Sequence, residues 1–222
     1  MFPVLILLGL WQLDRADEKR QIERDVNSAV EKPAVVINEV SGDLKLEVYR
    51  KAIISGQYDS DHQFLWDNKT HQGRPGFHVL TPFLIDGQAG AVIVNRGWVP
   101  MLGRRDQLPD VEVMQDTVTI SGVIKDPSNT IQLAEKRDLS GTKFPHIVQA
   151  FEPNDFGAEL GLTFLPIMIE LAKDEQHGYI REWKPYFGKI DRHNGYALQW
   201  FLMALITLFL FVKLNTKRAE VE

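Results

Sequence analysis

The chain has 222 residues, a length that allows one soluble domain together with two membrane anchors. Its formal net charge of −5 argues against a nucleic-acid-binding surface, because phosphate contacts need clustered Lys and Arg. The sequence contains no cysteine, which excludes a thiol-based copper carrier and a CxxC redox enzyme, since both need thiolates. The same absence permits an oxidising compartment without requiring one.

The first segment, residues 1–13, is apolar except for Gln12. As a helix it reaches only about 20 Å, which is too short to cross a membrane. A secretory signal peptide is the alternative, but the segment lacks a basic start and a small-residue cleavage site. We therefore predict a partial transmembrane helix whose beginning lies before this chain, with Trp11 in the membrane interface.

The next segment, residues 14–30, has the pattern of an amphipathic helix that continues out of the first anchor. Ile22, Val26, Ala29 and Val30 fall on one face, and charged residues make up most of the remainder. Oppositely charged residues three or four positions apart can pair on such a surface.

The middle of the chain, residues 31–190, is rich in strand patterns separated by turn residues. Several short strands with few helices predict an antiparallel β-rich domain, either barrel-like or a sandwich, which makes the chain an α+β membrane protein. The predicted strands are 46–58, 63–67, 77–85, 91–99, 117–125, 144–150 and 163–171, with a turn-rich connection at 68–76.

Two features of this domain are predicted in more detail. Residues 77–85 and 91–99 flank a short glycine-containing turn, which is the pattern of a β-hairpin. Residues 153–160 predict one short helix, with Gly161 as its stop signal.

The C-terminal segment predicts a transmembrane helix over residues 193–214, followed by a short polar tail at 215–222. Residues 196–212 carry no charge, and Tyr196 and Trp200 stand at one end, where amphipathic rings favour the headgroup level. The alternative is a buried helix of a large soluble protein, but the run is apolar on all sides rather than on one.

No enzyme signature is present in the sequence, so we expect a protein that is not an enzyme. The spacing of His62, His71 and His78 fits no compact zinc motif. A membrane-anchored hydrolase using Asp59, Asp61 and His62 is a weak alternative, because nothing supplies a nucleophile.

His193 at the mouth of the C-terminal helix is the residue most indicative of function. On a helix it shares a face with Tyr196, Ala197, Trp200 and Ala204. The two alanines would leave a shallow groove flanked by aromatic rings, in which a flat apolar macrocycle could lie with the imidazole as axial ligand of haem iron. The alternative is an interfacial histidine that bonds only headgroups or water.

Arg96 is the second candidate, at the end of a predicted strand. Its planar guanidinium could bind a carboxylate such as a haem propionate, and Arg104 and Arg105 could do the same. The alternative is a structural arginine that pairs with a carboxylate of the protein, beside a core Trp98.

Four motifs together resemble the surfeit locus protein 1 family, called Shy in yeast. They are LGLWQLDRADEK at 8–19, GRPGFH at 73–78, VNRGWVP at 94–100 and HNGYALQWF at 193–201. Each motif alone is weak, whereas their order and spacing extend over nearly the whole chain.

The resemblance implies two membrane helices around an extracytoplasmic domain, in a multi-pass protein of the bacterial inner membrane. It implies a chaperone-like assembly factor for cytochrome c oxidase, which binds haem a transiently and assists its insertion into subunit I. His193 would then be the haem iron ligand, with Tyr196, Trp200 and Trp11 around the macrocycle. The expected partners are subunit I, the haem a synthesis enzymes and membrane lipid. An interaction scaffold that holds oxidase subunits without binding haem is the rival function.

Overall fold

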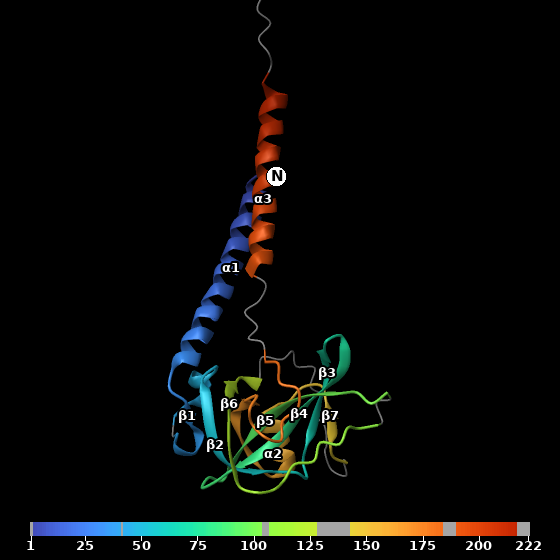
Figure 1. Cartoon of the computed structure of the whole chain (residues 1–222). Coiled ribbons are helices and arrows are strands. Elements are labelled where there is room, and N and C mark those ends of the chain that lie inside the picture. The colour runs from blue at the N-terminus through green and yellow to red at the C-terminus, as the bar shows by residue number, and fades with distance from the viewer. Residues whose placement is uncertain (1, 41, 104–106, 128–142, 184–189, 217–222) are drawn as a thin grey trace, which may run out of the picture. The chain divides into compact units, whose positions relative to one another are not determined.

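The structure, a computed structural model, describes residues 2–40, 42–103, 107–127, 143–183 and 190–216. It divides the chain into two compact units. One unit holds residues 1–28 and 185–222, and the other holds residues 29–184. Figure 1 labels the elements of both units.

The first unit contains most of the long helix α1 (Phe2–Glu31) and all of α3 (Ile190–Asn215). Within the described residues, α3 is the one helix that is long and apolar enough to cross a membrane, with a mean hydropathy of 2.0. The prediction of a second membrane-spanning helix is therefore not confirmed. The reason is that α1 is apolar only up to Leu13, after which charged residues dominate its remaining length.

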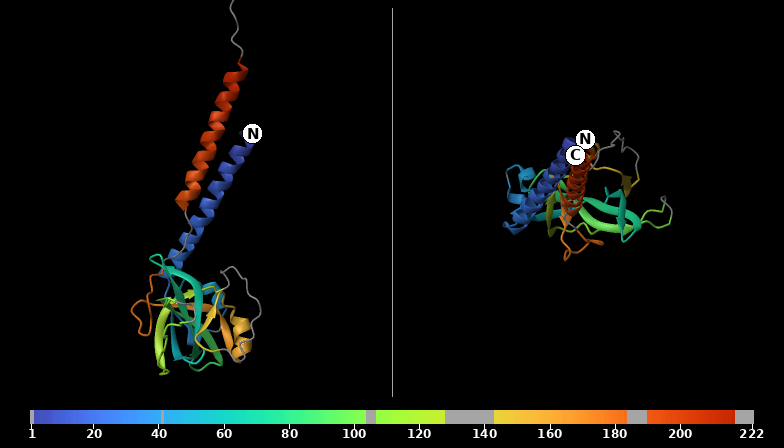
Figure 2. Two further views of the ribbon diagram at one scale, coloured as in Figure 1. Left: turned by 90° about the vertical axis from the view of Figure 1, so that its right-hand side faces the viewer. Right: turned by 90° about the horizontal axis from the view of Figure 1, so that it is seen from above.

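The two helices lie side by side, as the two directions of view in Figures 1 and 2 show. Apart from Val26 and Ala29 toward the end of α1, the buried residues are small or polar: Gly9, Gln12 and Ala16 on α1, and Ala197 and Ala204 on α3. Their spacings of three, four and seven place each set on one helix face. Small side chains at these positions allow the two backbones to approach closely.

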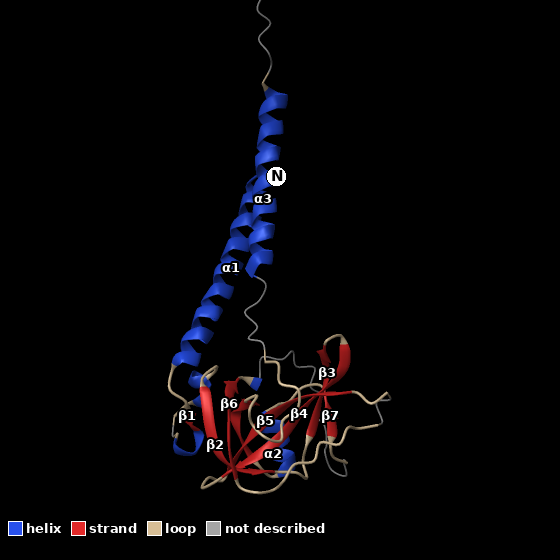
Figure 3. Ribbon diagram, viewed as in Figure 1, coloured by secondary structure: helices blue, strands red, loops and turns tan. Residues whose placement is uncertain are grey.

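The second unit is built around one eight-stranded sheet, drawn in red in Figure 3. The strand order is β1-β2-β6-β8-β5-β4-β3-β7. The elements are β1 (Val35–Val36), the 3-10 helices η1 (Ile37–Glu39) and η2 (Leu44–Glu47), β2 (Lys51–Tyr58), β3 (Phe64–His71), β4 (Arg74–Ile85), β5 (Gly90–Pro100), β6 (Val118–Lys125), β7 (His146–Val148), α2 (Pro153–Leu160) and β8 (Thr163–Leu171).

An additional pairing between β2 and β4 joins the sheet back on itself and makes it barrel-like. This pairing brings Gly56 opposite Ile85, and a Cβ at Gly56 would lie 2.0 Å from the backbone oxygen of Leu84. Only glycine permits so close an approach of two strands. The sheet is mixed rather than antiparallel as predicted, because β1–β2, β3–β7 and β5–β8 are parallel pairs.

Several predicted elements are confirmed by the structure. The β4–β5 hairpin is antiparallel, and α2 ends at Gly161 in the left-handed conformation with φ 66°. Two predicted boundaries are wrong. The first part of 46–58 lies in the 3-10 helix η2 and a turn. The predicted turn region 68–76 is mostly strand, because β3 continues to His71 and β4 begins at Arg74.

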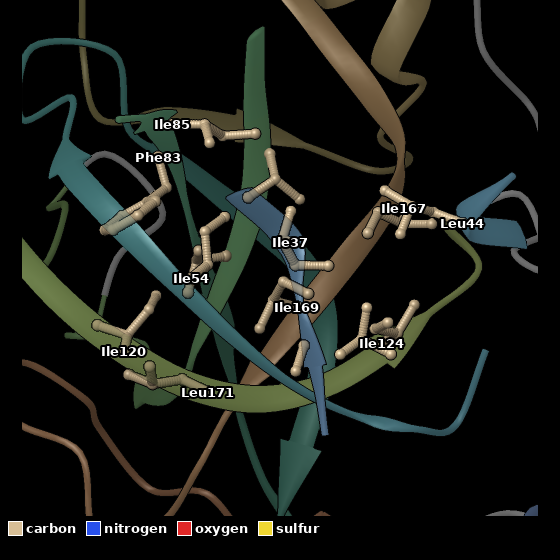
Figure 4. Close-up of a cluster of buried hydrophobic side chains, with 14 of the residues drawn as sticks. Ile37, Leu44, Ile54, Phe83, Ile85, Ile120, Ile124, Ile167, Ile169 and Leu171 are labelled. Carbon is tan, nitrogen blue, oxygen red and sulfur yellow. The ribbon is translucent and has the colours of Figure 1, made fainter. Parts of the chain in front are cut away.

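The largest core cluster lies inside the barrel and consists mainly of branched aliphatic side chains, as Figure 4 shows. Ile54, Ile167 and Ile169 are fully buried there, and Ile37 of η1 packs against the same cluster. A second cluster contains Phe64 and includes aromatic residues from the region of α2. Alternation along the strands thus sends apolar residues inward, which holds the barrel together through burial of apolar surface.

Candidate functional site

His193 lies near the N-terminal end of α3 and is hydrogen-bonded to α1. Its Nδ1 is 2.8 Å from Oε1 of Gln12, a side chain that is only 9% exposed. An amide oxygen can only accept a hydrogen bond, so the Nδ1–H group of His193 donates to it. The lone pair of Nε2 is then available, and among the described residues Nε2 has no hydrogen-bond partner.

Two further contacts between α1 and α3 flank this bond. Arg20 donates from Nη2 to Oδ1 of Asn194 at 3.0 Å. Gly9 packs so closely against the ring of Phe201 that a Cβ added to Gly9 would lie 2.5 Å from a ring carbon. The Gln12–His193 bond therefore sits within a helix contact that is fixed by a polar pair on one side and a close ring contact on the other.

The aromatic residues expected around a macrocycle occupy different environments. Tyr196 is 39% exposed and has the Arg192 guanidinium 5.7 Å from its ring centre, whereas Trp200 is half-buried. Ala197 and Ala204 are each 1% exposed. The predicted groove over these two alanines is therefore wrong, because packing within the helix unit covers them. The accessible part of the predicted face is its flank at Tyr196 and Trp200.

Trp11 is half exposed and directly precedes Gln12 on α1. Its ring lies 5.8 Å from the Arg15 guanidinium. Consecutive residues on a helix point about 100° apart, so Trp11 projects to a different side of α1 than Gln12 does. Its predicted position against the second face of a macrocycle stays a prediction.

Arg96 lies in the interior of the β unit, where it is 1% exposed. All three guanidinium nitrogens donate hydrogen bonds to neutral oxygens of the domain. Nε donates to the backbone oxygen of His177 at 2.7 Å, and Nη2 donates to the backbone oxygen of Glu112 at 3.2 Å. Nη1 has three acceptors, which are Oε1 of Gln63 at 2.7 Å, Oγ1 of Thr81 at 3.3 Å and the backbone oxygen of Val111 at 2.9 Å.

This arrangement fits a structural role for Arg96 rather than the predicted contact with a propionate. A propionate could bind only after several of these buried bonds had broken. The structural alternative also differs from its expected form, since the acceptors are amide, hydroxyl and backbone oxygens rather than a carboxylate. Arg104 and Arg105, the neighbouring candidates, lie outside the described residues.

Two tyrosine rings complete the surroundings of Arg96. Its guanidinium carbon is 5.6 Å from the Tyr58 ring centre and 5.1 Å from that of Tyr179. Burial raises the pKa of Tyr58 to about 12, although the charge of Arg96 acts in the opposite direction. Tyr58 therefore stays neutral at physiological pH and contributes a cation–π contact.

The histidines of the β unit are distributed among separate contacts. His62 Nδ1 is 2.7 Å from Oδ2 of Asp59, and His71 is 4.0 Å from Glu182. His78 Nδ1 accepts from Nδ2 of Asn95 at 3.1 Å. The Asp59–His62 pair could supply the base and its orienting carboxylate for the weak hydrolase alternative. That alternative also needs a nucleophile hydrogen-bonded to His62, and none is seen among the described residues.

Gln12 is the site residue that sequence reasoning missed. In the sequence it is only a polar interruption of an apolar segment, and its partner lies 181 residues away. A buried polar side chain in an apolar helix is costly unless it is hydrogen-bonded. That cost is the signal that could have marked Gln12 as a contact residue.

Comparison with known proteins gives a consistent result. A model of the SURF1 family matches residues 1–205. The SURF1-like protein of Monosiga brevicollis is 21% identical over 223 residues, covering 95% of this chain and 83% of the relative. That of Rickettsia conorii is 23% identical over 228 residues, covering 95% and 86%. That of Rickettsia felis is 31% identical over 100 residues, covering 44% and 42%.

Proposed function

Because the chain belongs to the SURF1 family, we propose that it is an assembly factor for cytochrome c oxidase that binds haem a transiently and assists its insertion into subunit I. Membership of this family is generally linked to oxidase assembly. The observation that supports the haem-binding part of the proposal is His193. It is an imidazole at the start of an apolar helix, with Nδ1 hydrogen-bonded and Nε2 available.

The residues around His193 are suited to a flat, largely apolar cargo. Imidazole is a common axial ligand of haem iron, and Nε2 would be the ligating atom. Tyr196 and Trp200 follow one and two helix turns later on the same face, where they would contact the macrocycle. Arg192 lies over Tyr196 and would provide a cation for a propionate, a role that the buried Arg96 is not placed to fill.

The proposed location is the bacterial inner membrane, with α3 crossing the bilayer and the β unit on the extracytoplasmic side. The apolar stretch of α3 supports the membrane assignment. In this arrangement the porphyrin would remain in lipid while its propionates face the headgroups. The N-terminal apolar part of α1 would form the second, partial membrane segment of a multi-pass protein.

The proposed role requires no bond to be made or broken in the cargo apart from the ligand bond to iron, so we propose that the protein is not an enzyme. A carrier has to release what it binds. One axial ligand from the protein, rather than two, is suited to such transfer to a partner such as subunit I. The haem a synthesis enzymes would be the source of the cargo.

The test is an optical spectrum of the detergent-purified protein, co-expressed with the haem a synthesis enzymes. We expect a haem a band in the wild type that is lost in His193→Ala. His62→Ala is the matched control, because it also removes one partly exposed imidazole, but from the β unit. That control should keep the band, and both variants should retain the circular dichroism of the folded protein.

The rival function, a scaffold that binds oxidase subunits without haem, makes the opposite prediction. No haem band in the wild type would contradict the carrier function and favour the scaffold. An equal band in the wild type and in His193→Ala would contradict the assignment of His193 as ligand. Pull-down of subunit I with each variant then separates the two roles, since a scaffold should bind the subunit without His193.

A further inference from the structure

We propose that Gln12 is a positioning residue that holds His193 in the Nδ1–H tautomer and so presents Nε2 to the iron. This inference rests on the proposed function of His193 as haem ligand. It adds a second residue of α1 to the predicted site, for which the sequence indicated Trp11 on α1, Arg96 in the β unit, and His193, Tyr196 and Trp200 on α3. A ligand whose second nitrogen is fixed by a hydrogen bond has its ring orientation and its tautomer set before the metal arrives.

The geometry of the contact supports this role. The distance of 2.8 Å between Nδ1 and Oε1 is that of a well-formed hydrogen bond. Gln12 is 9% exposed on the face of α1 that contains Gly9 and Ala16, so its amide has little water to bond to. Imidazole is the partner that the structure supplies, and losing that partner would leave a buried amide oxygen unsatisfied.

The position of Gln12 along the helix contact is also fixed. Gly9 is three residues before it and packs on Phe201, and Arg20 is eight residues after it and bonds Asn194. These two contacts on either side of Gln12 set the register of α1 against α3. The amide is therefore held opposite His193 by the pairing of the helices and not only by its own bond.

The hydrogen bond should also affect ligand strength. A donor interaction from Nδ1–H makes the opposite nitrogen more basic, which strengthens its bond to a metal. Loss of such an outer contact typically weakens metal affinity about 10–100-fold. We expect a decrease of this size in haem affinity when Gln12 is replaced by a residue that cannot accept a hydrogen bond.

The first test needs no haem. The full chain is labelled with 15N-histidine, purified in detergent without haem, and the His193 ring nitrogens are observed by NMR at a pH where the imidazole is neutral. We expect Nδ1 to carry the proton in the wild type. Gln12→Met, which keeps the length and helix propensity of the side chain but removes the acceptor, should shift the population to Nε2–H.

Two further variants make this result specific. Gln199→Met makes the same change on an exposed position of α3 and should leave the His193 signals unchanged. Gln12→Glu still offers an acceptor, a carboxylate oxygen, and should restore the Nδ1–H tautomer that Gln12→Met loses. An Nε2–H tautomer in the wild type, or an unchanged tautomer in Gln12→Met, would overturn the inference.

The second test is haem retention of the same variants. We expect about 10–100-fold weaker binding for Gln12→Met and near wild-type binding for Gln199→Met. Equal haem affinity of Gln12→Met and the wild type would overturn the positioning role. A wild type that shows the Nδ1–H tautomer but binds no haem would instead overturn the proposed function, while the Gln12–His193 bond would stand.

Discussion

The interior of the β unit around Arg96 and the helix pair around His193 each hold a nitrogen-rich side chain, but they satisfy its hydrogen-bonding groups to different extents. Arg96 is fully buried, whereas His193 is partly buried. Every nitrogen of Arg96 donates to an oxygen of its own domain, whereas His193 has one nitrogen bonded to Gln12 and the other available. A completely satisfied polar group stabilises a fold, and a half-satisfied one keeps binding capacity for something else.

His78 differs from His193 in the role of its Nδ1 atom, which accepts a hydrogen bond rather than donating one. Asn95 donates to Nδ1 of His78, and the amide oxygen of Asn95 accepts from the backbone N–H of Gly97, which fixes the direction of that amide. His78 is therefore protonated on Nε2, the opposite tautomer to that assigned to His193. The bonding partner of Nδ1 decides which ring nitrogen remains available.

The largest expected effect comes from breaking the Arg96 network. Arg96→Met should destabilise the β unit by at least about 3 kcal/mol, because several buried oxygens lose their donor at once. Urea unfolding of the full chain in detergent, followed by β-sheet circular dichroism, measures this loss. Arg74→Met on the exposed start of β4 is the control and should change stability little. Haem bound per folded molecule should stay at the wild-type level in both, and a selective loss of haem in Arg96→Met would restore Arg96 as a cargo contact.

The next effect depends on pH. Burial, with a smaller contribution from Lys69, lowers the pKa of His78 to about 4 from an unperturbed 6.5. Between these values the unfolded state binds more protons than the folded state, so the free energy of unfolding should fall as the pH drops from 6.5 toward 4. The contribution is about 1.4 kcal/mol for each unit of the shift in pKa.

His78→Gln should remove this contribution and leave the other acid-sensitive groups in place. Urea unfolding at several pH values should therefore give a steeper loss of stability for the wild type than for the variant in this window. Above pH 7 the two curves should run parallel, which serves as the internal control. Parallel curves at all pH values would show that His78 is not the group responsible.

The smallest expected effect concerns the helix pair. Gly9→Ala places a methyl group against the Phe201 ring and should weaken the pairing of α1 and α3 by about 1 kcal/mol, as overpacking does. Gly195→Ala is the matched change on α3, where nothing lies within 4 Å of the added carbon, and it should stabilise the helix slightly. The two variants are compared by the thermal loss of helical circular dichroism. Equal melting curves would mean that the close contact between Gly9 and Phe201 does not contribute to the stability of the helix pair.

Local patterns in the sequence were enough to predict much of the fold. The β4–β5 hairpin, α2 with its Gly161 stop, β8 and the apolar stretch of α3 all follow from periodicity and turn residues over short windows. The parallel pairs of the sheet did not follow. They join segments far apart in the chain, such as β5 with β8, and strand periodicity contains no information about the neighbour.

In the candidate site, too, some residues could be predicted from the local sequence, whereas others depend on contacts between distant segments. His193 could be found because an imidazole beside an uncharged helix is chemically conspicuous. Gln12 could not be assigned, because its meaning depends on the register of two helices at opposite ends of the chain. The hydrogen-bond partners of Arg96 could not be predicted for a related reason, since these acceptors lie near Val111 and His177 and only the folded domain brings them to it.

The place of β8 in the sheet has a consequence for biosynthesis. This strand lies between β5 and β6, so the barrel cannot close until residues 163–171 have been translated. Only residues 172–189 then precede α3, the apolar helix. The closing strand and the apolar helix are therefore synthesised almost together, and β5 and β6 lack their common neighbour until β8 is available. Strand edges that lack a neighbour favour aggregation, so the position of β8 makes the unfinished chain more prone to aggregate than the complete one.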